Sequence, residues 1–124
     1  QLGDLVHLAD GPNKLQNVTI QFDAWACQRG DRTTCDTDPG ATFAHPITVT
    51  IYSADLSTKL AEVTEIVDVP FRPTRDATCP ALSSEPAGSG WRADDGECYN
   101  GYGFRWTFDF PSGPVLPSDV VWTV

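Results

Sequence analysis

Apolar and polar side chains alternate with a period of two along several segments of this 124-residue chain, and few folds accommodate that pattern. From Val18 to Trp25, one face carries Val, Ile, Phe and Ala, and the other carries Thr, Gln, Asp and Trp. From Phe104 to Phe110, four aromatic side chains share one face. Because successive side chains of a β-strand point to opposite sides, both segments are predicted strands with one buried face.

The composition also favours strands. Val, Ile and Thr together number 27, whereas Lys, Glu and Met together number 6. Branched side chains fit a pleated sheet, and the straight side chains that are scarce here are those that helices favour. We therefore predict an all-β domain with little or no helix.

Four more segments are predicted strands: residues 5–9, residues 47–52 with Pro46 at the start, residues 58–69 with a bulge or a bend near Glu65 and Ile66, and residues 120–124. Two long segments, 27–45 and 70–101, lack the alternation and are predicted loops. Six or seven strands with one apolar face predict a two-sheet antiparallel sandwich of the jelly-roll or Greek-key type. An open barrel is the alternative. Residues 1–124 are interpreted as a single domain.

The four cysteines indicate how the long loops are held. They allow three pairings, and proximity in the sequence favours Cys27 with Cys35 and Cys79 with Cys98. A zinc site is the alternative, but seven and eighteen intervening residues match no common zinc pattern. Four Cys, no Met and few Lys are typical of a secreted chain, so we expect two disulfides and an extracellular location.

The charge excludes two classes of partner. Seventeen acidic residues against eight basic ones give a net charge of -9, which disfavours nucleic acid and anionic membrane surfaces. No apolar run approaches the roughly 18 to 20 residues of a membrane span, so membrane insertion is not expected.

Five short segments form an ordered set along the chain: residues 2–6, 41–49, 69–73, 98–101 and 116–121. Together they resemble secreted bacterial β-sandwich proteins of unknown function, known as hypothetical extracellular proteins. The resemblance implies the sandwich fold and secretion, and it implies no activity. It also implies a last strand that runs on into a further segment.

The last predicted strand stops at Val124 without a turn residue or a cap. A strand edge of this kind would leave its backbone groups unpaired. We therefore expect either that the native polypeptide continues beyond residue 124 or that a strand of another chain pairs there.

Two acidic clusters within the loops raise a calcium hypothesis. Calcium is held by six to eight oxygens, which nearby carboxylates and loop carbonyls supply. The spacing differs from that of an EF-hand, and Asp and Gly are also common in ordinary turns. No other cofactor is predicted. The candidate ligands are Asp31, Asp36, Asp38, Asp94, Asp95 and Glu97.

Four aromatic residues outside the predicted core raise a glycan hypothesis, because the C–H groups of a sugar ring pack on aromatic rings. Trp106 shares a face with three Phe and is expected in the core. The alternative interpretation is that the other aromatics anchor the loops from beneath. The candidate ligand-binding residues are Trp25, Trp91, Tyr99 and Tyr102.

Catalysis has little support from the sequence. His7 and His45 are the only histidines, and neither has a nucleophile near it in the sequence. We predict no catalytic residue. The leading hypothesis is a non-catalytic extracellular domain that binds a glycan or another extracellular protein through its disulfide-closed loops. The alternatives are a structural subunit of a surface assembly, completed by strand pairing at the C-terminal edge, and a secreted hydrolase.

Overall fold

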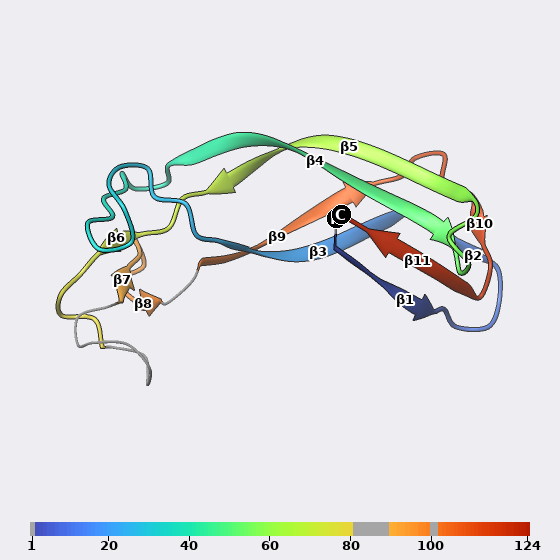
Figure 1. Cartoon of the computed structure of the whole chain (residues 1–124), viewed down its shortest axis with the longest axis horizontal. Helices are drawn as coiled ribbons and strands as arrows, with labels where there is room; N and C mark the ends of the chain where they lie inside the picture. The colour runs from blue at the N-terminus through green and yellow to red at the C-terminus, as the bar shows by residue number, and fades with distance from the viewer. Residues whose placement is uncertain (1, 81–89, 100–101) are drawn as a thin grey trace. The chain divides into compact units, whose positions relative to one another are not determined.

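The chain was examined as a computed structural model, which describes residues 2–80, 90–99 and 102–124. These residues form strands and no helix, and the paired strands run antiparallel, so the all-β prediction is confirmed (Figure 1). In the part of the chain that is described, no helix is long and apolar enough to cross a membrane. The strands are β1 (Gly3–His7), β2 (Asn13–Lys14), β3 (Asn17–Ala24), β4 (Thr42–Ser53), β5 (Lys59–Pro70), β6 (Thr74–Arg75), β7 (Trp91–Arg92), β8 (Cys98–Tyr99), β9 (Tyr102–Asp109), β10 (Val115–Leu116) and β11 (Asp119–Thr123).

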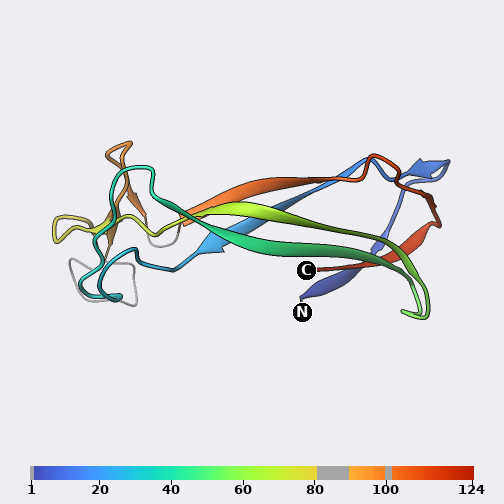
Figure 2. The ribbon, with the colours of Figure 1, turned by 90° about the horizontal axis from the view of Figure 1, so that it is seen from above.

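The strands pair into four sheets. The largest has the order β1-β11-β4-β5, and β3 pairs with β9 (Figure 2). The smaller sheets are β10-β2 and β6-β7-β8. A jelly-roll order is not evident from these pairings, because the described sheets do not close on one another.

The C-terminal strand lies inside the largest sheet. On one side β11 pairs with β1 from Asp119↔His7 to Thr123↔Gly3, and on the other it pairs with β4. Val124 and Leu2 also exchange two backbone hydrogen bonds, of 2.7 and 2.9 Å. The expectation of an open edge at residues 120–124 is therefore wrong, because both neighbours of this strand come from the chain itself. The outer strands of this four-stranded sheet are β1 and β5.

The alternation predicted for β3 and β9 is present in the structure. Ile20 and Ala24 of β3 are buried, while Gln21 and Asp23 are exposed. Phe108 of β9 is fully buried, as expected for its aromatic face. Trp106, expected in the core, is only half-buried.

Pro46 lies inside β4 rather than at its start, because the strand begins at Thr42. A proline in a strand needs a position where no neighbouring carbonyl awaits an N–H. β11 pairs with β4 only from Thr50 to Ser53, so Pro46 lies beyond the stretch that this neighbour covers. The proline therefore costs no hydrogen bond to β11.

The predicted bulge or bend near Glu65 and Ile66 is not needed, because burial alternates from Ala61 to Val69 of β5. Ile66 points outward and is 63% exposed, while Glu65 is half-buried. Glu65 accepts the indole N–H of Trp106 at 2.9 Å and the backbone N–H of Asp109 at 3.1 Å. These hydrogen bonds compensate for turning a carboxylate inward.

The chain divides into two compact units. The first comprises residues 1–20, 46–67 and 106–124, and the second comprises residues 21–45 and 68–105. The first unit buries a conventional apolar core of Leu15, Ile20, Val49, Ile51, Val67, Phe108, Phe110, Leu116 and Val120. The second unit has fewer buried aliphatic side chains and buries Ala24, Cys35, Val69, Arg72, Cys79 and Trp91.

Candidate binding site in the disulfide-closed loops

Two disulfides close the predicted loops, and their pairing is confirmed. Cys27 is bonded to Cys35 with their Cα atoms 5.4 Å apart, and Cys79 is bonded to Cys98 with a separation of 5.6 Å. The described residues contain no free cysteine, which leaves no thiolate for the alternative zinc site. Both disulfides belong to the second unit.

Arg29 organises the first loop. Its guanidinium donates to both carboxylate oxygens of Asp38 at 2.8 and 2.9 Å and to Asp36 at 2.9 Å. The backbones of Arg29 and Asp36 form a β-bridge. The hydrogen bond from Arg29 is the main cause that lowers the pKa of Asp38. Two of the three candidate calcium ligands in this loop are therefore already neutralised by a cation.

The third carboxylate of this loop stabilises a turn. Asp31 Oδ1 accepts hydrogen bonds from the backbone and hydroxyl groups of Thr33 and Thr34, at 2.7 to 3.1 Å. These bonds, chiefly that from the Thr33 hydroxyl, lower the pKa of Asp31 to about 2. Gly30 precedes the turn with a φ of +79°. A Cβ there would lie 2.4 Å from the carbonyl oxygen of Thr34, so only glycine fits.

A hairpin of β7 and β8 carries the second acidic cluster. Asp95 accepts the backbone N–H of Glu97 at 2.9 Å and the phenol of Tyr99 at 2.7 Å. The phenol is the main cause that lowers the pKa of Asp95, and the same bond raises the pKa of Tyr99. Asp31 and Asp95 thus serve as acceptors for groups of their own loops. No group of three or more metal-ligating side chains occurs among the residues described, and calcium stays a prediction.

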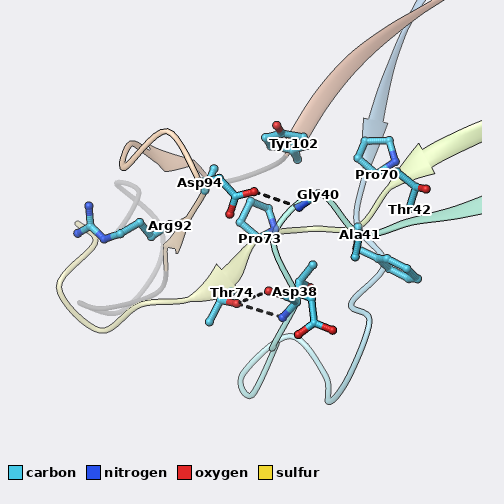
Figure 3. Close-up of a pocket in the computed structure, with 13 residues that line it drawn as sticks. Asp38, Gly40, Ala41, Thr42, Pro70, Pro73, Thr74, Arg92, Asp94 and Tyr102 are labelled. Carbon is cyan, nitrogen blue, oxygen red and sulfur yellow. Dashed lines mark hydrogen bonds between the residues drawn. The ribbon is translucent and has the colours of Figure 1, made fainter.

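The two loops meet, although they are far apart in the sequence. The backbone N–H of Gly40, in the first loop, donates to Asp94 Oδ2 in the second at 3.0 Å (Figure 3). Thr37 and Thr74 exchange two hydrogen bonds of 3.0 Å, and the Thr37 hydroxyl donates to the carbonyl of Arg72 at 2.7 Å. These contacts fix the relative position of the loops within the second unit.

A pocket of about 170 Å³ lies where the loops meet. Tyr102 contributes an aromatic ring, Asp38 and Asp94 contribute carboxylates, and Pro70 and Pro73 contribute rigid apolar surface (Figure 3). Three of the residues proposed from the sequence as site residues, Asp38, Asp94 and Tyr102, are thus brought together.

Arg92 also lines the pocket, but its guanidinium is held elsewhere. It donates to Asp76 at 2.6 Å, to the carbonyl of Gly96 at 2.5 Å and to the hydroxyl of Thr78 at 2.9 Å. Bonds from the Thr78 hydroxyl and then from Arg92 hold the pKa of Asp76 well below its usual range. The charge of Arg92 is therefore paired outside the pocket, and of the two lining aspartates Asp38 is paired with Arg29 while Asp94 accepts the backbone N–H of Gly40.

The four predicted aromatic residues separate into two places. Tyr99 and Tyr102 lie edge to face, with ring centroids 5.7 Å apart. Trp25 is 55% exposed and lies over the guanidinium of Arg72, and Trp91 lies over the same guanidinium but is 1% exposed. The structure corrects the prediction for Trp91, because a ring that is buried against Arg72 presents no face to a ligand.

The histidines do not form a catalytic group with the residues around them. His7 Nδ1 lies 2.9 Å from Asp119 Oδ1, and Ser118 Oγ donates to the other oxygen of the same carboxylate. The aspartate therefore lies between serine and histidine, whereas a nucleophilic triad needs the histidine between the other two. His45 is exposed and contacts the ring of Phe43.

Sequence reasoning missed the arginines that organise this region: Arg29, Arg72 and Arg92. For Arg29 a signal existed, because the predicted loop 27–45 contains only two arginines, Arg29 and Arg32, beside three aspartates. For Arg72 and Arg92 the partners are far away in the sequence, and no local pattern reveals them.

Comparison of the chain with protein-family models, curated proteins and solved structures gives no match. The geometry of the pocket between the two loops is therefore the basis for the function proposed below.

Proposed function

We propose that this chain is a non-catalytic extracellular domain that binds a glycan, and that its disulfide-closed loops hold one sugar ring in the pocket at Tyr102. The observation that carries the proposal is the pocket itself, where the ring of Tyr102 and the carboxylate of Asp94 lie beside the loop that contains Gly40. An apolar face combined with a few fixed polar groups is the chemistry that orients a small ring with several hydroxyl groups.

The size of the pocket supports a single ring. Drug-sized ligands occupy pockets of roughly 300 to 1,000 Å³, whereas a cavity of about 150 Å³ holds one six-membered aromatic ring. At about 170 Å³, the pocket is too small for a folded peptide segment and matches one ring.

The charge of the pocket supports a neutral or amino sugar. Asp94 has one carboxylate oxygen beyond the one that Gly40 occupies, and it can accept a sugar hydroxyl. A uronate or sulfated sugar would bring a second negative charge beside Asp94 on a chain of net charge -9.

The two disulfides support an extracellular location, because such bonds persist in oxidising compartments. The proposal includes a two-sheet sandwich of the jelly-roll type. The four-stranded sheet and the β3-β9 pair both contribute side chains to the core of the first unit, which is how the two faces of a sandwich behave.

Replacing Tyr102 with leucine is expected to weaken binding to neutral glycans about tenfold, because one aromatic stacking contact contributes about 1.4 kcal/mol. Titration calorimetry with neutral and uronate-containing oligosaccharides measures this loss. Tyr52→Leu is the matched control, because Tyr52 is a half-buried tyrosine of β4 that does not line the pocket. Equal affinity of Tyr102→Leu and the wild type would contradict the assignment of the pocket.

A structural role in a surface assembly is the second candidate, and the outer strand β1 favours it. Leu5 of β1 is 57% exposed at the edge of the four-stranded sheet. Pairing of this edge with a strand of another copy would cover both the backbone and Leu5. Such pairing predicts a dimer in sedimentation equilibrium that Leu5→Lys dissociates. Leu56→Lys, a change of another exposed leucine, should leave the dimer intact. A wild-type monomer would exclude the pairing.

A further inference from the structure

The outer face of the β3-β9 pair carries a second set of groups that the pocket does not use. Gln21 and Asp23 occupy alternate positions near the end of β3, Trp25 follows in the same alternation just beyond it, and Gly103 and Arg105 occupy alternate positions at the start of β9. All five residues are exposed, and none of them lines the pocket. Their side chains face away from the buried residues of the same strands, such as Ala24.

The ring of Trp25 packs against the buried guanidinium of Arg72. The guanidinium carbon of Arg72 lies 4.7 Å from the Trp25 ring centroid and 4.2 Å from that of Trp91. Arg72 is 4% exposed and Trp91 is 1% exposed, so the exposed indole rests on a buried cation that itself rests on a buried indole. The backbone N–H of Arg72 also donates to the carbonyl of Ala26 at 2.8 Å. An aromatic ring that is ordered before the ligand arrives loses less conformational entropy on binding.

The surface beside Trp25 is polar. Arg105 Nε donates to Gln21 Oε1 at 2.9 Å, which ties the two strands together through side chains. Gly103 lies beside this pair, and a Cβ there would come within 2.7 Å of Gln21 Nε2 and 3.3 Å of Asp23 Oδ1. Because Gly103 has no side chain, the side chains of Gln21 and Asp23 pack close to the backbone of β9 and keep this surface polar.

The dimensions and charges of this face indicate the kind of ligand. From Trp25 to Gln21 the strand advances four residues, about 13 Å at roughly 3.3 Å per residue, which is longer than one sugar ring. Asp23 and Arg105 contribute one charge of each sign, whereas the whole chain carries -9. A neutral chain of several rings therefore fits the face better than a polyanion does.

We propose that Trp25, together with Gln21, Asp23 and Arg105, forms a second glycan site that binds a neutral linear polysaccharide along the β3-β9 pair. One ring stacks on Trp25, and the hydroxyl groups of the following rings contact the polar row. The ligand class rests on the proposed function, but the residues are separate from those of the pocket.

Affinity electrophoresis in gels that contain a neutral soluble polysaccharide (a β-glucan, a xylan or a galactomannan) tests the site. We expect Trp25→Ala to raise the dissociation constant at least tenfold and Trp25→Tyr to restore most of the affinity, because tyrosine also offers a ring face. Leu56→Ala, which removes a large exposed side chain elsewhere, is expected to bind like the wild type. Circular dichroism melting of each variant shows that the loss is not unfolding.

The outcomes distinguish this inference from the proposed function. If Trp25→Ala binds as the wild type does while Tyr102→Leu binds weakly, the second site is wrong and the pocket stands. If Trp25→Ala binds weakly and Tyr102→Leu is unaffected, the second site stands and the pocket is wrong. A wild-type chain that none of the three polysaccharides retards would overturn the second site, whereas the pocket, which also fits an amino sugar, is judged by the calorimetry of Tyr102→Leu.

Discussion

Replacing Arg72 with alanine is expected to lower the free energy of unfolding by about 3 to 5 kcal/mol. The change removes a buried side chain of the second unit from between Trp25 and Trp91 and leaves a cavity. Truncating a large buried side chain to alanine typically costs about 2 to 5 kcal/mol, and each desolvated cation–π contact contributes about 1 to 2 kcal/mol. Urea denaturation followed by tryptophan fluorescence measures the loss, because both indoles report on the stack.

Two further variants separate the contribution of charge from that of packing. Burial, and next the positive charge of Arg32, lower the pKa of Arg72. Among the described residues, Arg72 Nε and Trp91 Nε1 are the buried side-chain nitrogens without a hydrogen-bond partner. Arg72→Lys keeps the charge and loses the planar stacking, and we expect it to cost about 1 to 2 kcal/mol. Arg72→Met keeps much of the volume without the charge. If the free energy of unfolding of Arg72→Met equals that of the wild type, the cation–π contribution is negligible. A loss of less than about 1 kcal/mol for Arg72→Ala contradicts the role of the stack as a core.

Removing the disulfide between Cys79 and Cys98, by replacing both with alanine, is expected to cost about 3.3 kcal/mol. The estimate follows from the chain entropy released when a loop with a sequence separation of 19 is opened. The equivalent change at Cys27 and Cys35, with a separation of 8, is expected to cost about 2.6 kcal/mol. Alanine is chosen because Cys79 and Cys35 are buried, and a serine hydroxyl there would need a partner.

Chemical denaturation of both double variants and of the wild type, without reductant, gives the comparison. We expect the wild type to be the most stable, the Cys27/Cys35 variant to follow, and the Cys79/Cys98 variant to be the least stable. The differences are expected to shrink to nearly nothing when the wild type and both variants are all measured fully reduced, because no chain then carries a disulfide. The reverse order would show that native packing around each bond outweighs loop length.

Elements with unbroken alternation were predictable from the sequence. The strands at β3 and β9 were placed within two residues of their observed bounds, because one face of each is apolar at every second position. Pairing of the nearest cysteines was predictable for a related reason, since both bonds close local loops.

The errors arose where a distant residue changes the local preference. At Glu65 the alternation of the sequence breaks, but the indole N–H of Trp106 makes an inward carboxylate acceptable. At Val124 the apolar ending suggested an open edge, but β1, from the other end of the chain, covers it.

The candidate site was only partly predictable. The acidic loops and Tyr102 were recognised as separate features, but their convergence depends on the contact of Gly40 with Asp94, which are 54 residues apart. Arg72 resembles a solvated charge in a proline-rich segment, and its burial follows only from two tryptophans at positions 25 and 91. Long-range contacts of this kind leave no periodic trace in the sequence.

The pairing of β1 with β11 also determines how the domain responds to mechanical force. Leu2 and Val124 are hydrogen-bonded to each other at one end of the ladder, and the pairs continue from Gly3↔Thr123 to His7↔Asp119. A load that pulls Leu2 and Val124 apart therefore acts across the ladder, and it opens the pairs one after another like a zipper rather than shearing them all at once. The domain yields at low tension when it is pulled at these two residues, and β1 is the first strand to detach.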